Sequence, residues 1–286
     1  MDARTAPELT NPRAERVRSV RALAGRSVRE RQGRFVVEGP QAVRELVRFE
    51  PTRVRELYLS PRAAARYPEV MDDAAAAGLH VRSGTAEVLD AMSPDAQGVV
   101  AVADLLAARL ADVVAAGPRL VAVLSRVRDP GNAGTVIRSA DAAGADAVAL
   151  TQASVDPHNP KTVRASAGSL FHVPVARGGE PAGVVGALRE AGLTVLAADG
   201  AGQWDLDDLL DAAVPGGGRH RGMPDLAGPT AWLFGNEAWG LPPEDRALAD
   251  AVVRVPIHGR AESLNLATAA AVCLYASARA QRRGRG

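Results

Sequence analysis

The sequence predicts an α/β protein in which a small α/β domain precedes a larger domain built on a mostly parallel sheet. Three observations favour this class. Strand-like and helix-like segments alternate strictly from about residue 120 onward. Hydrophobic residues make up 47% of the 286 residues, enough for a sizeable core. Aromatic residues are only 3%, so Leu, Val and Ala must fill that core. Such alternation argues for parallel strands with helices on both faces of the sheet.

The first part of the chain begins with a basic segment, 10–34, which we expect to be a helix. A strand and turn follow at 35–40. Apolar periodicity then predicts strands at 54–59, 79–82 and 99–103, and helices at 41–48, 61–77 and 85–91. Residues 104–118 end in Gly117-Pro118 and suit a linker. We therefore predict two domains, 1–105 and 118–286.

The second part repeats strand and helix more strictly. Strands are predicted at 120–124, 147–151, 171–175, 194–198, 231–234 and 251–255. Helices are predicted at 132–143, 159–168, 181–191, 206–211, 243–249 and 263–282. A Gly/Pro-rich loop, 214–229, is either a disordered insertion or a mobile edge of a site.

Composition excludes several classes of function. No apolar run approaches the roughly 20 residues that span a bilayer, so we expect a soluble cytoplasmic protein. The single cysteine, Cys273, rules out an internal disulfide, and we expect a buried, inert thiol. Phosphate-binding, dinucleotide and hydrolase signatures are absent, and the five histidines lack metal-ligand spacing. We therefore expect no metal site.

The charge is unevenly distributed. The net charge is only +1, yet residues 1–34 hold nine Arg against four acidic residues, and the chain ends in a basic tail. Basic ends on a near-neutral body favour contact with a polyanion, although a solvated terminal helix remains an equal alternative. Lys161 is the only lysine. It shares a helix face with Arg164, three residues on, and the pair suits a phosphate or an RNA backbone.

Three strand-to-polar-turn junctions carry the candidate site. The first runs from Asn132 to Arg138, where Asn132 is well placed to cap the next helix and Arg138 lies among small residues. A buried arginine there would need an anionic partner. The second holds Gly235 and Glu237 beyond an apolar strand. In open α/β sheets, ligands bind beyond the carboxyl ends of the strands.

The third junction, 254–266, opens the final helix. Ser263 is a ready N-cap and Asn265 fits the first turn. Each of these polar residues could be a plain structural cap. Three such junctions in one half of the chain nevertheless indicate a single composite site, since free backbone amides and polar side chains meet at each.

Taken together and in this order, the segments resemble the SpoU (TrmH-like) family of RNA ribose methyltransferases. The family pattern Asn-x-Gly-x-x-x-Arg begins at Asn132, Phe-Gly-x-Glu-x-x-Gly-Leu at Phe234, and Ile-Pro-Met-x-Gly-x-x-x-Ser-Leu-Asn-Val at Val255. Departures are mild: Val255 replaces Ile, Ile257 replaces Met and Leu266 replaces Val. Segments 161–168 and 34–40 are also similar to the family, and the latter opens its substrate-binding domain.

The resemblance implies a trefoil-knotted SPOUT catalytic domain, a homodimer with sites at the subunit interface, and methyl transfer from S-adenosylmethionine to a ribose 2′-hydroxyl, most often in ribosomal RNA. Arg138 matches the catalytic arginine. A guanidinium is hard to deprotonate, which favours phosphate binding and orientation of the hydroxyl over a role as base. Asn132, Glu237, Ser263 and Asn265 would hold this arginine and the ribose.

The resemblance also places the cofactor against the knot loops. The expected cofactor contacts are Leu196, Gly235, Val255, Ile257 and Leu264. The expected RNA contacts are Lys161, Arg164, Arg29, Arg31 and Arg34, through salt-sensitive bonds to phosphate. Two alternatives stay open: a non-catalytic RNA-binding or ribosome-assembly protein on the same fold, and a transfer RNA as substrate.

Overall fold

The computed structural model describes residues 8–106, 108–214, 217–218 and 220–283. The chain divides into two compact units, and each is described by itself. The first unit contains residues up to 106 together with 158–172, and the second contains 107–157 and 173–286. This division differs from the predicted boundaries in one segment, because 158–172 packs with the first unit.

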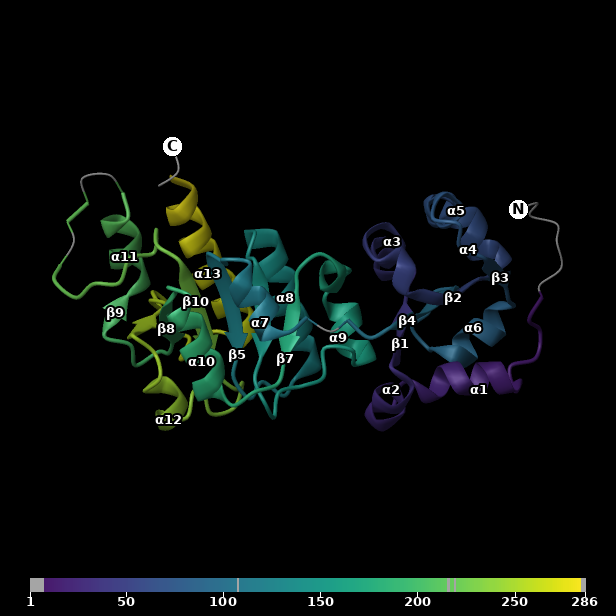
Figure 1. Ribbon diagram of the computed structural model, residues 1–286, viewed down its shortest axis with the longest axis horizontal. Coiled ribbons are helices and arrows are strands. Elements are labelled where there is room, and N and C mark those ends of the chain that lie inside the picture. The colour runs from purple at the N-terminus through teal and green to yellow at the C-terminus, as the bar shows by residue number, and fades with distance from the viewer. Residues whose placement is uncertain (1–7, 107, 215–216, 219, 284–286) are drawn as a thin grey trace. The chain divides into compact units, whose positions relative to one another are not determined.

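The first unit is a four-stranded sheet between helices (Figure 1). Its strands are β1 (Arg34–Glu38), β2 (Val54–Leu59), β3 (Val81–Ser83) and β4 (Val99–Asp104), in the order β1-β4-β2-β3. Strand β4 is antiparallel to both β1 and β2, and β2 is parallel to β3. Its helices are α1 (Glu15–Ala22), α2 (Arg26–Gln32), α3 (Pro40–Phe49), α4 (Pro61–Arg66), α5 (Pro68–Ala76), α6 (Ala86–Met92) and α9 (Pro160–Ala165). Short 3₁₀ turns lie at Pro51–Arg53 and Ser169–Phe171.

Two predicted helices of this unit are each broken in two. The helix predicted at 10–34 is α1 and α2, which meet at Gly25, the extended residue before α2. The helix predicted at 61–77 stops at Tyr67, because Pro68 lacks an amide hydrogen and starts a new helix. Helices α1 and α6 bury Val17, Val20 and Met92 against one face of the sheet.

The second unit is a seven-stranded sheet in the order β7-β6-β5-β10-β8-β11-β9. All six pairings between its neighbouring strands are parallel. The strands are β5 (Leu120–Leu124), β6 (Ala147–Leu150), β7 (Val175–Arg177), β8 (Thr194–Ala198), β9 (Trp204–Asp205), β10 (Thr230–Phe234) and β11 (Ala251–Arg254). The predicted mostly parallel sheet is confirmed.

Helices cover both faces of this sheet (Figure 1). They are α7 (Leu110–Ala115), α8 (Pro130–Ala143), α10 (Pro181–Glu190), α11 (Leu206–Ala212), α12 (Pro243–Arg246) and α13 (Leu266–Arg283). Alternate residues of the central strands pack against α7 and α10. The opposite face packs against α8 and α13, where the Trp232 indole donates to Ser277 Oγ at 2.9 Å. Both faces are therefore buried, as a parallel sheet requires.

Several boundaries differ from those predicted. Helix α7 lies inside the predicted linker, β7 begins at Val175 rather than 171, and α13 begins at Leu266 rather than 263. The loop predicted at 214–229 and the basic tail lie partly outside the described residues, at 215–216, 219 and 284–286. The predicted knot stays a prediction. No helix in the described part of the chain is long and apolar enough to cross a membrane.

Candidate active site at the carboxyl edge of the parallel sheet

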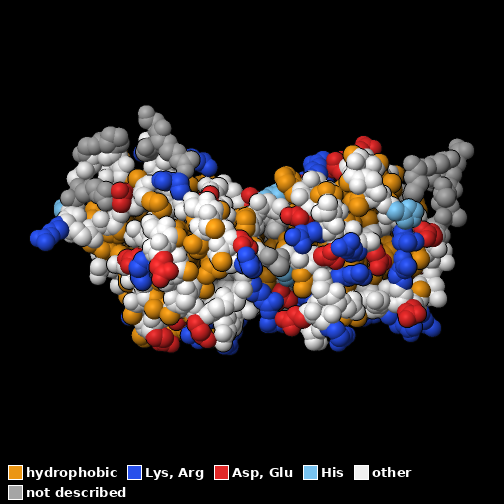
Figure 2. Space-filling model, in the orientation of Figure 1, with side chains coloured by type: hydrophobic (Ala, Val, Ile, Leu, Met, Phe, Trp, Pro, Cys, Tyr) orange, Lys and Arg blue, Asp and Glu red, His pale blue; other side chains and the backbone are white. Residues whose placement is uncertain are grey.

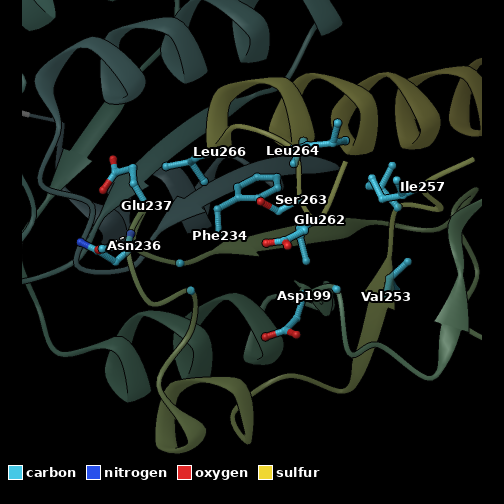
Figure 3. A pocket seen from close by; sticks show the side chains of 17 residues that line it. Asp199, Phe234, Asn236, Glu237, Val253, Ile257, Glu262, Ser263, Leu264 and Leu266 are labelled. Carbon is cyan, nitrogen blue, oxygen red and sulfur yellow. Dashed lines mark hydrogen bonds between the residues drawn. The ribbon is translucent and has the colours of Figure 1, made fainter. Parts of the chain in front are cut away.

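A cavity of about 330 Å³ lies at the carboxyl ends of β8, β10 and β11 (Figure 3). This is the edge at which open α/β sheets bind ligands, and the volume is in the range of roughly 300–1,000 Å³ typical of small-molecule sites. The segments that line it are 198–200, 234–238, Gly240, Val253, Val255, Ile257, 262–264, Leu266 and Ala269. Of the five predicted cofactor contacts, Gly235, Val255, Ile257 and Leu264 are in this wall.

Leu196 is not in the wall. It is fully buried in β8, where its Cα partners are Trp232 and Ala251. The cavity begins only at Ala198, where β8 ends. Leu196 therefore supports the sheet, and from this part of the chain it is Ala198, Asp199 and Gly200 that line the cavity.

The cavity combines apolar walls with carboxylates. Phe234 lies in its middle, and Val253 and Ile257 lie at the end away from Glu237 (Figure 3). Asp199 and Glu262 add two carboxylates to the wall. An apolar surface suits a flat ring, and two carboxylates favour a ligand that carries positive charge.

Gly235 is required by a close approach of the backbone. A Cβ built at this position would lie 2.3 Å from Gly240 C and 2.4 Å from Leu241 N. The chain folds back here, because Asn236 and Gly240 exchange two backbone hydrogen bonds of 2.9 Å. The missing side chain thus accommodates the hairpin 236–240, of which residues 236–238 and 240 line the cavity.

A chain of hydrogen bonds joins the three predicted motifs. Asn265 Nδ2 donates to Asn132 Oδ1 at 3.0 Å, and Asn132 Nδ2 donates to Glu237 Oε1 at 3.3 Å. The Asp129 amide donates to the same Glu237 oxygen at 3.3 Å. Three residues from separate parts of the sequence therefore meet at the carboxyl edge of the sheet.

The direction of donation along these hydrogen bonds is fixed by α13. Asn265 Oδ1 accepts from the amides of Ala267 and Thr268, at 2.9 and 3.4 Å, so its amide nitrogen must face Asn132. Asn132 then receives a donor on its oxygen and presents its own nitrogen to Glu237. Oε2 of Glu237 has no hydrogen-bond partner among the described residues.

The two predicted helix caps are corrected. Asp129, not Asn132, caps α8, since its carboxylate accepts from the Asn132 amide at 2.7 Å and Pro130 takes the first helical position. Asn265, not Ser263, caps α13. Ser263 is exposed and lines the cavity, and Asn132 is released from capping to link Asn265 with Glu237.

Arg138 is exposed rather than buried, so the predicted close-packed environment is wrong. Six residues turn a helix by roughly 600°, which leaves Arg138 about 120° around the axis of α8 from Asn132 and roughly 9 Å along it. Arg138 makes no hydrogen bond or ion pair with the described residues of this chain. Its guanidinium is thus available to a ligand or to a second molecule.

One hydrogen-bond network at this edge of the sheet was not predicted by any sequence motif. Asp245 of α12 is buried, and its carboxylate accepts from Ser125 Oγ at 2.6 Å and from Arg126 Nε at 3.0 Å. The pair raises the pKa of the Arg126 guanidinium, chiefly through this hydrogen bond. The Arg126 carbonyl accepts from Asn236 Nδ2 at 3.0 Å. Asp245 therefore ties together the loops that follow β5 and β10.

The predicted RNA contacts all lie in the first unit. Lys161 and Arg164 are exposed on α9, and Arg31 and Arg34 are exposed near β1. Arg164 is engaged by two carboxylates, buried Glu38 and exposed Asp95. Burial raises the pKa of Glu38, against the opposing effect of Arg164.

Arg29 has a structural role instead. It is only 1% exposed, and its guanidinium donates to the carbonyl oxygens of Leu23 and Ala24 at 2.9 and 2.7 Å. These bonds hold the turn between α1 and α2, so the predicted contact of Arg29 with RNA is not supported. Over the first unit, basic and acidic side chains are interspersed (Figure 2). The charge open to RNA is therefore smaller than the number of arginines suggests.

No group of three or more His, Cys, Asp or Glu side chains that could hold a metal ion occurs in the described ranges. Cys273 is buried, and burial raises the pKa of its thiol. The reactive equipment of the second unit is therefore a cavity, a fixed chain of amides ending in a carboxylate, and an unpartnered arginine. Such a set suits a site that binds a small molecule and orients a second reactant beside it.

Comparison with known proteins identifies the class of protein. The SpoU rRNA methylase family model matches residues 119–275, and the RNA 2′-O ribose methyltransferase substrate-binding model matches residues 36–107. The chain belongs to the SpoU rRNA methylase family, which confirms the predicted family and enzyme class.

Two curated relatives and a solved structure are similar to most of this chain. A 23S rRNA (guanosine(2553)-2′-O)-methyltransferase, RlmP, of Bacillus subtilis is 30% identical over 94% of this chain and 98% of its own length. RlmB of Bordetella pertussis, a 23S rRNA (guanosine-2′-O-)-methyltransferase, is 33% identical over 87% and 98%. The crystal structure of AviRb of Streptomyces viridochromogenes in complex with the cofactor AdoMet has a TM-score of 0.76, at 31% identity over 96% and 100%.

Proposed function

We propose that this chain transfers a methyl group from S-adenosylmethionine to a ribose 2′-hydroxyl of RNA, and that the RNA is 23S ribosomal RNA. The observation that carries the proposal is the hydrogen-bonded chain Asn265–Asn132–Glu237 beside a ligand-sized cavity. The two relatives named above act on 23S rRNA. Such a substrate implies that the protein works in the cytoplasm.

The cavity suits the cofactor in its chemistry. Phe234, Val255 and Leu264 offer apolar surface to an adenine ring, and the backbone of Gly235 is open because it carries no side chain. Asp199 and Glu262 offer negative charge to a molecule with a sulfonium and an ammonium group. When bound, the cofactor supplies a methyl group already activated for transfer.

The residues of the chain then have to orient a hydroxyl and receive its proton. Glu237 is held by Asn132 and by the Asp129 amide through Oε1, which leaves Oε2 to accept a hydrogen bond from a ribose hydroxyl and to take its proton as the methyl group is transferred. Fixing the ribose hydroxyl oxygen in line with the methyl group accounts for much of the rate enhancement expected of such a site. Ser263, exposed at the cavity wall, assists in holding the ribose.

The proposed role of Arg138 is to bind a phosphate of the RNA. A guanidinium stays charged at every accessible pH, so its role is to bind the phosphate beside the target ribose. Because Arg138 points away from Asn132 within one chain, we place it in the site of a homodimer. Helix α13 packs beside α8 and exposes Val272 and Tyr275, at 40% and 51%. Two copies of this helix pair can cover each other around a twofold axis.

The first unit supplies a second contact with RNA. Lys161 and Arg31 are exposed there, and bonds from such residues to phosphate position RNA without reading its sequence. Arg164 contributes less, because Glu38 and Asp95 already neutralise it. RNA binding should weaken as salt rises.

The test is transfer of tritiated methyl from S-adenosylmethionine to 23S rRNA, with ribose methylation mapped afterwards. Arg138→Ala should lower turnover by about 100-fold while cofactor affinity is kept. Absence of incorporation by the wild-type protein over a range of salt, with rRNA bound normally, would favour the non-catalytic RNA-binding protein instead. If the labelled methyl group is incorporated into transfer RNA and not into 23S rRNA, the substrate is transfer RNA instead.

A further inference from the structure

One aromatic ring at the edge of the site is not buried. Trp239 is 54% exposed, whereas Trp232 is fully buried and Trp204 is half-buried. Aromatic residues are scarce in this chain, at 3%. Exposing the largest of them is unfavourable unless the ring meets something. It lies two residues beyond Glu237, in the hairpin that forms one wall of the cavity.

The hairpin that carries this ring is held by its own hydrogen bonds. The backbone bonds between Asn236 and Gly240 close the hairpin, and Asn236 Oδ1 accepts from the Ala238 amide at 2.9 Å. Asn236 is in turn fixed to the Arg126 carbonyl. The loop that carries Trp239 is therefore braced by its own hydrogen bonds, while 54% of the Trp239 surface stays exposed.

A cation lies over the indole. Arg128 Cζ is 5.2 Å from the centroid of the Trp239 ring, within the distance of a cation–π contact. Arg128 is itself exposed and follows β5, so it comes from the same loop as Asp129, whose amide binds Glu237. The guanidinium and the indole thus form a flat, positively charged pair at the edge of the candidate site.

We infer that Trp239 and Arg128 form a stacking platform for an unpaired nucleobase of the RNA substrate, next to the ribose that is methylated. The inference rests on the proposed function. Indole and guanidinium planes are the surfaces on which proteins stack splayed bases, and the charge of Arg128 also attracts phosphate. Every base has a π-face, so this contact adds affinity and position but no base identity.

The chemistry of the pair favours a nucleobase over a second copy of the chain. The exposed apolar side chains Val272 and Tyr275, which suit contact between copies, lie on α13 rather than on this hairpin. A base stacked on Trp239 would keep its sugar near Glu237, because the two residues belong to the same hairpin and are two positions apart in the sequence.

The experiment compares Trp239→Ala and Trp239→Phe with wild type. Trp239→Ala should raise KM for 23S rRNA about tenfold, which is ~1.4 kcal/mol, with affinity for S-adenosylmethionine measured by calorimetry unchanged. Trp239→Phe keeps a ring and should stay within about threefold of wild type. Trp204→Phe is the matched control, because Trp204 lies on β9 outside the cavity wall, and its KM should not change.

A direct signal comes from fluorescence. Titration with single-stranded oligouridylate or oligoadenylate should quench tryptophan emission in wild type and in Trp204→Phe, but not in Trp239→Phe. Unchanged KM in Trp239→Ala, with methylation by wild type intact, overturns the platform and leaves the proposed function standing. The platform is also overturned if Trp239→Ala loses affinity for S-adenosylmethionine as much as it loses KM for RNA, because the ring would then bind the cofactor. It is likewise overturned if Trp239→Ala no longer forms a dimer in sedimentation, because the ring would then lie between two copies. Failure of wild type to methylate any RNA counts against the proposed function itself.

Discussion

The amide of Asn265 has two separable tasks, and one substitution separates them. Its oxygen caps α13 by accepting from Ala267 and Thr268, and its nitrogen donates to Asn132. Asn265→Asp keeps the shape of the side chain and one oxygen for the cap. The nitrogen becomes a second oxygen, which faces the Asn132 oxygen formerly 3.0 Å from a donor.

The effect on activity follows from this geometry. Two oxygens cannot share a hydrogen bond, so Asn132 either loses that contact or turns its amide over. If it turns, its oxygen faces the Glu237 carboxylate and a bond to a charged group is lost. Both contacts are exposed, so water can replace the lost bond at little cost to stability. The orientation of Glu237 is lost, however, so kcat/KM should fall about 10- to 100-fold.

The effect on stability is opposite. An aspartate is at least as good an N-cap as asparagine, and a negative charge at a helix N-terminus adds about 0.3–1 kcal/mol. The free energy of unfolding of Asn265→Asp should therefore equal or exceed that of wild type. Asn265→Ala removes the cap, and its unfolding free energy should fall by about 1 kcal/mol.

The assay is steady-state methyl transfer together with urea unfolding of the same preparations. Asn11→Asp is the matched control, since Asn11 Oδ1 also accepts a local backbone amide, from Arg13 at 2.9 Å, in the first unit. The reasoning is refuted if Asn265→Asp turns over like wild type, or if its unfolding free energy falls as far as that of the alanine variant.

Three further predictions concern other parts of the chain. Gly235→Ala places a Cβ 2.3 Å from the Gly240 backbone, so the hairpin must move, and calorimetry should show at least about tenfold weaker binding of S-adenosylmethionine; unchanged affinity would contradict the assigned cavity. The buried Cys273 thiol should react with a thiol reagent only after unfolding, and rapid labelling of the native protein would show the burial to be wrong. The raised pKa of Glu38 means that the folded state binds the proton more tightly than the unfolded state. The stabilising contribution of this carboxyl group is therefore fully present below pH 4.5, its ordinary pKa, and is lost as pH rises through the pKa of the folded state. The unfolding free energy of Glu38→Gln should therefore gain on that of wild type as pH rises above 4.5 in urea titrations, and a gain toward acid pH would reverse the sign.

The sequence contains enough to predict which motifs meet. In a parallel sheet the carboxyl ends of all strands lie at one edge, so polar residues that follow β5, β10 and β11 must come together. Asn132, Glu237 and Asn265 do so through direct hydrogen bonds. The periodicity of the strands was sufficient for this inference, without any knowledge of side-chain positions.

What could not be predicted depends on contacts between distant residues. The burial of Arg29 requires the turn after α1 to offer two carbonyl oxygens, which no local pattern announces. The exposure of Arg138 depends on which face of α8 packs against α13. Asp245 has no motif at all, yet it joins two loops of the site through Ser125 and Arg126.

The strand order of the second unit also bears on how the protein is made. Strand β10 lies between β5 and β8, although both are synthesised before it. Until residues 230–234 leave the ribosome, each of these two strands has an unpaired edge, and the two edges face the same gap. Late insertion of a central strand is a non-local event, which slows folding and leaves growing chains open to association with one another.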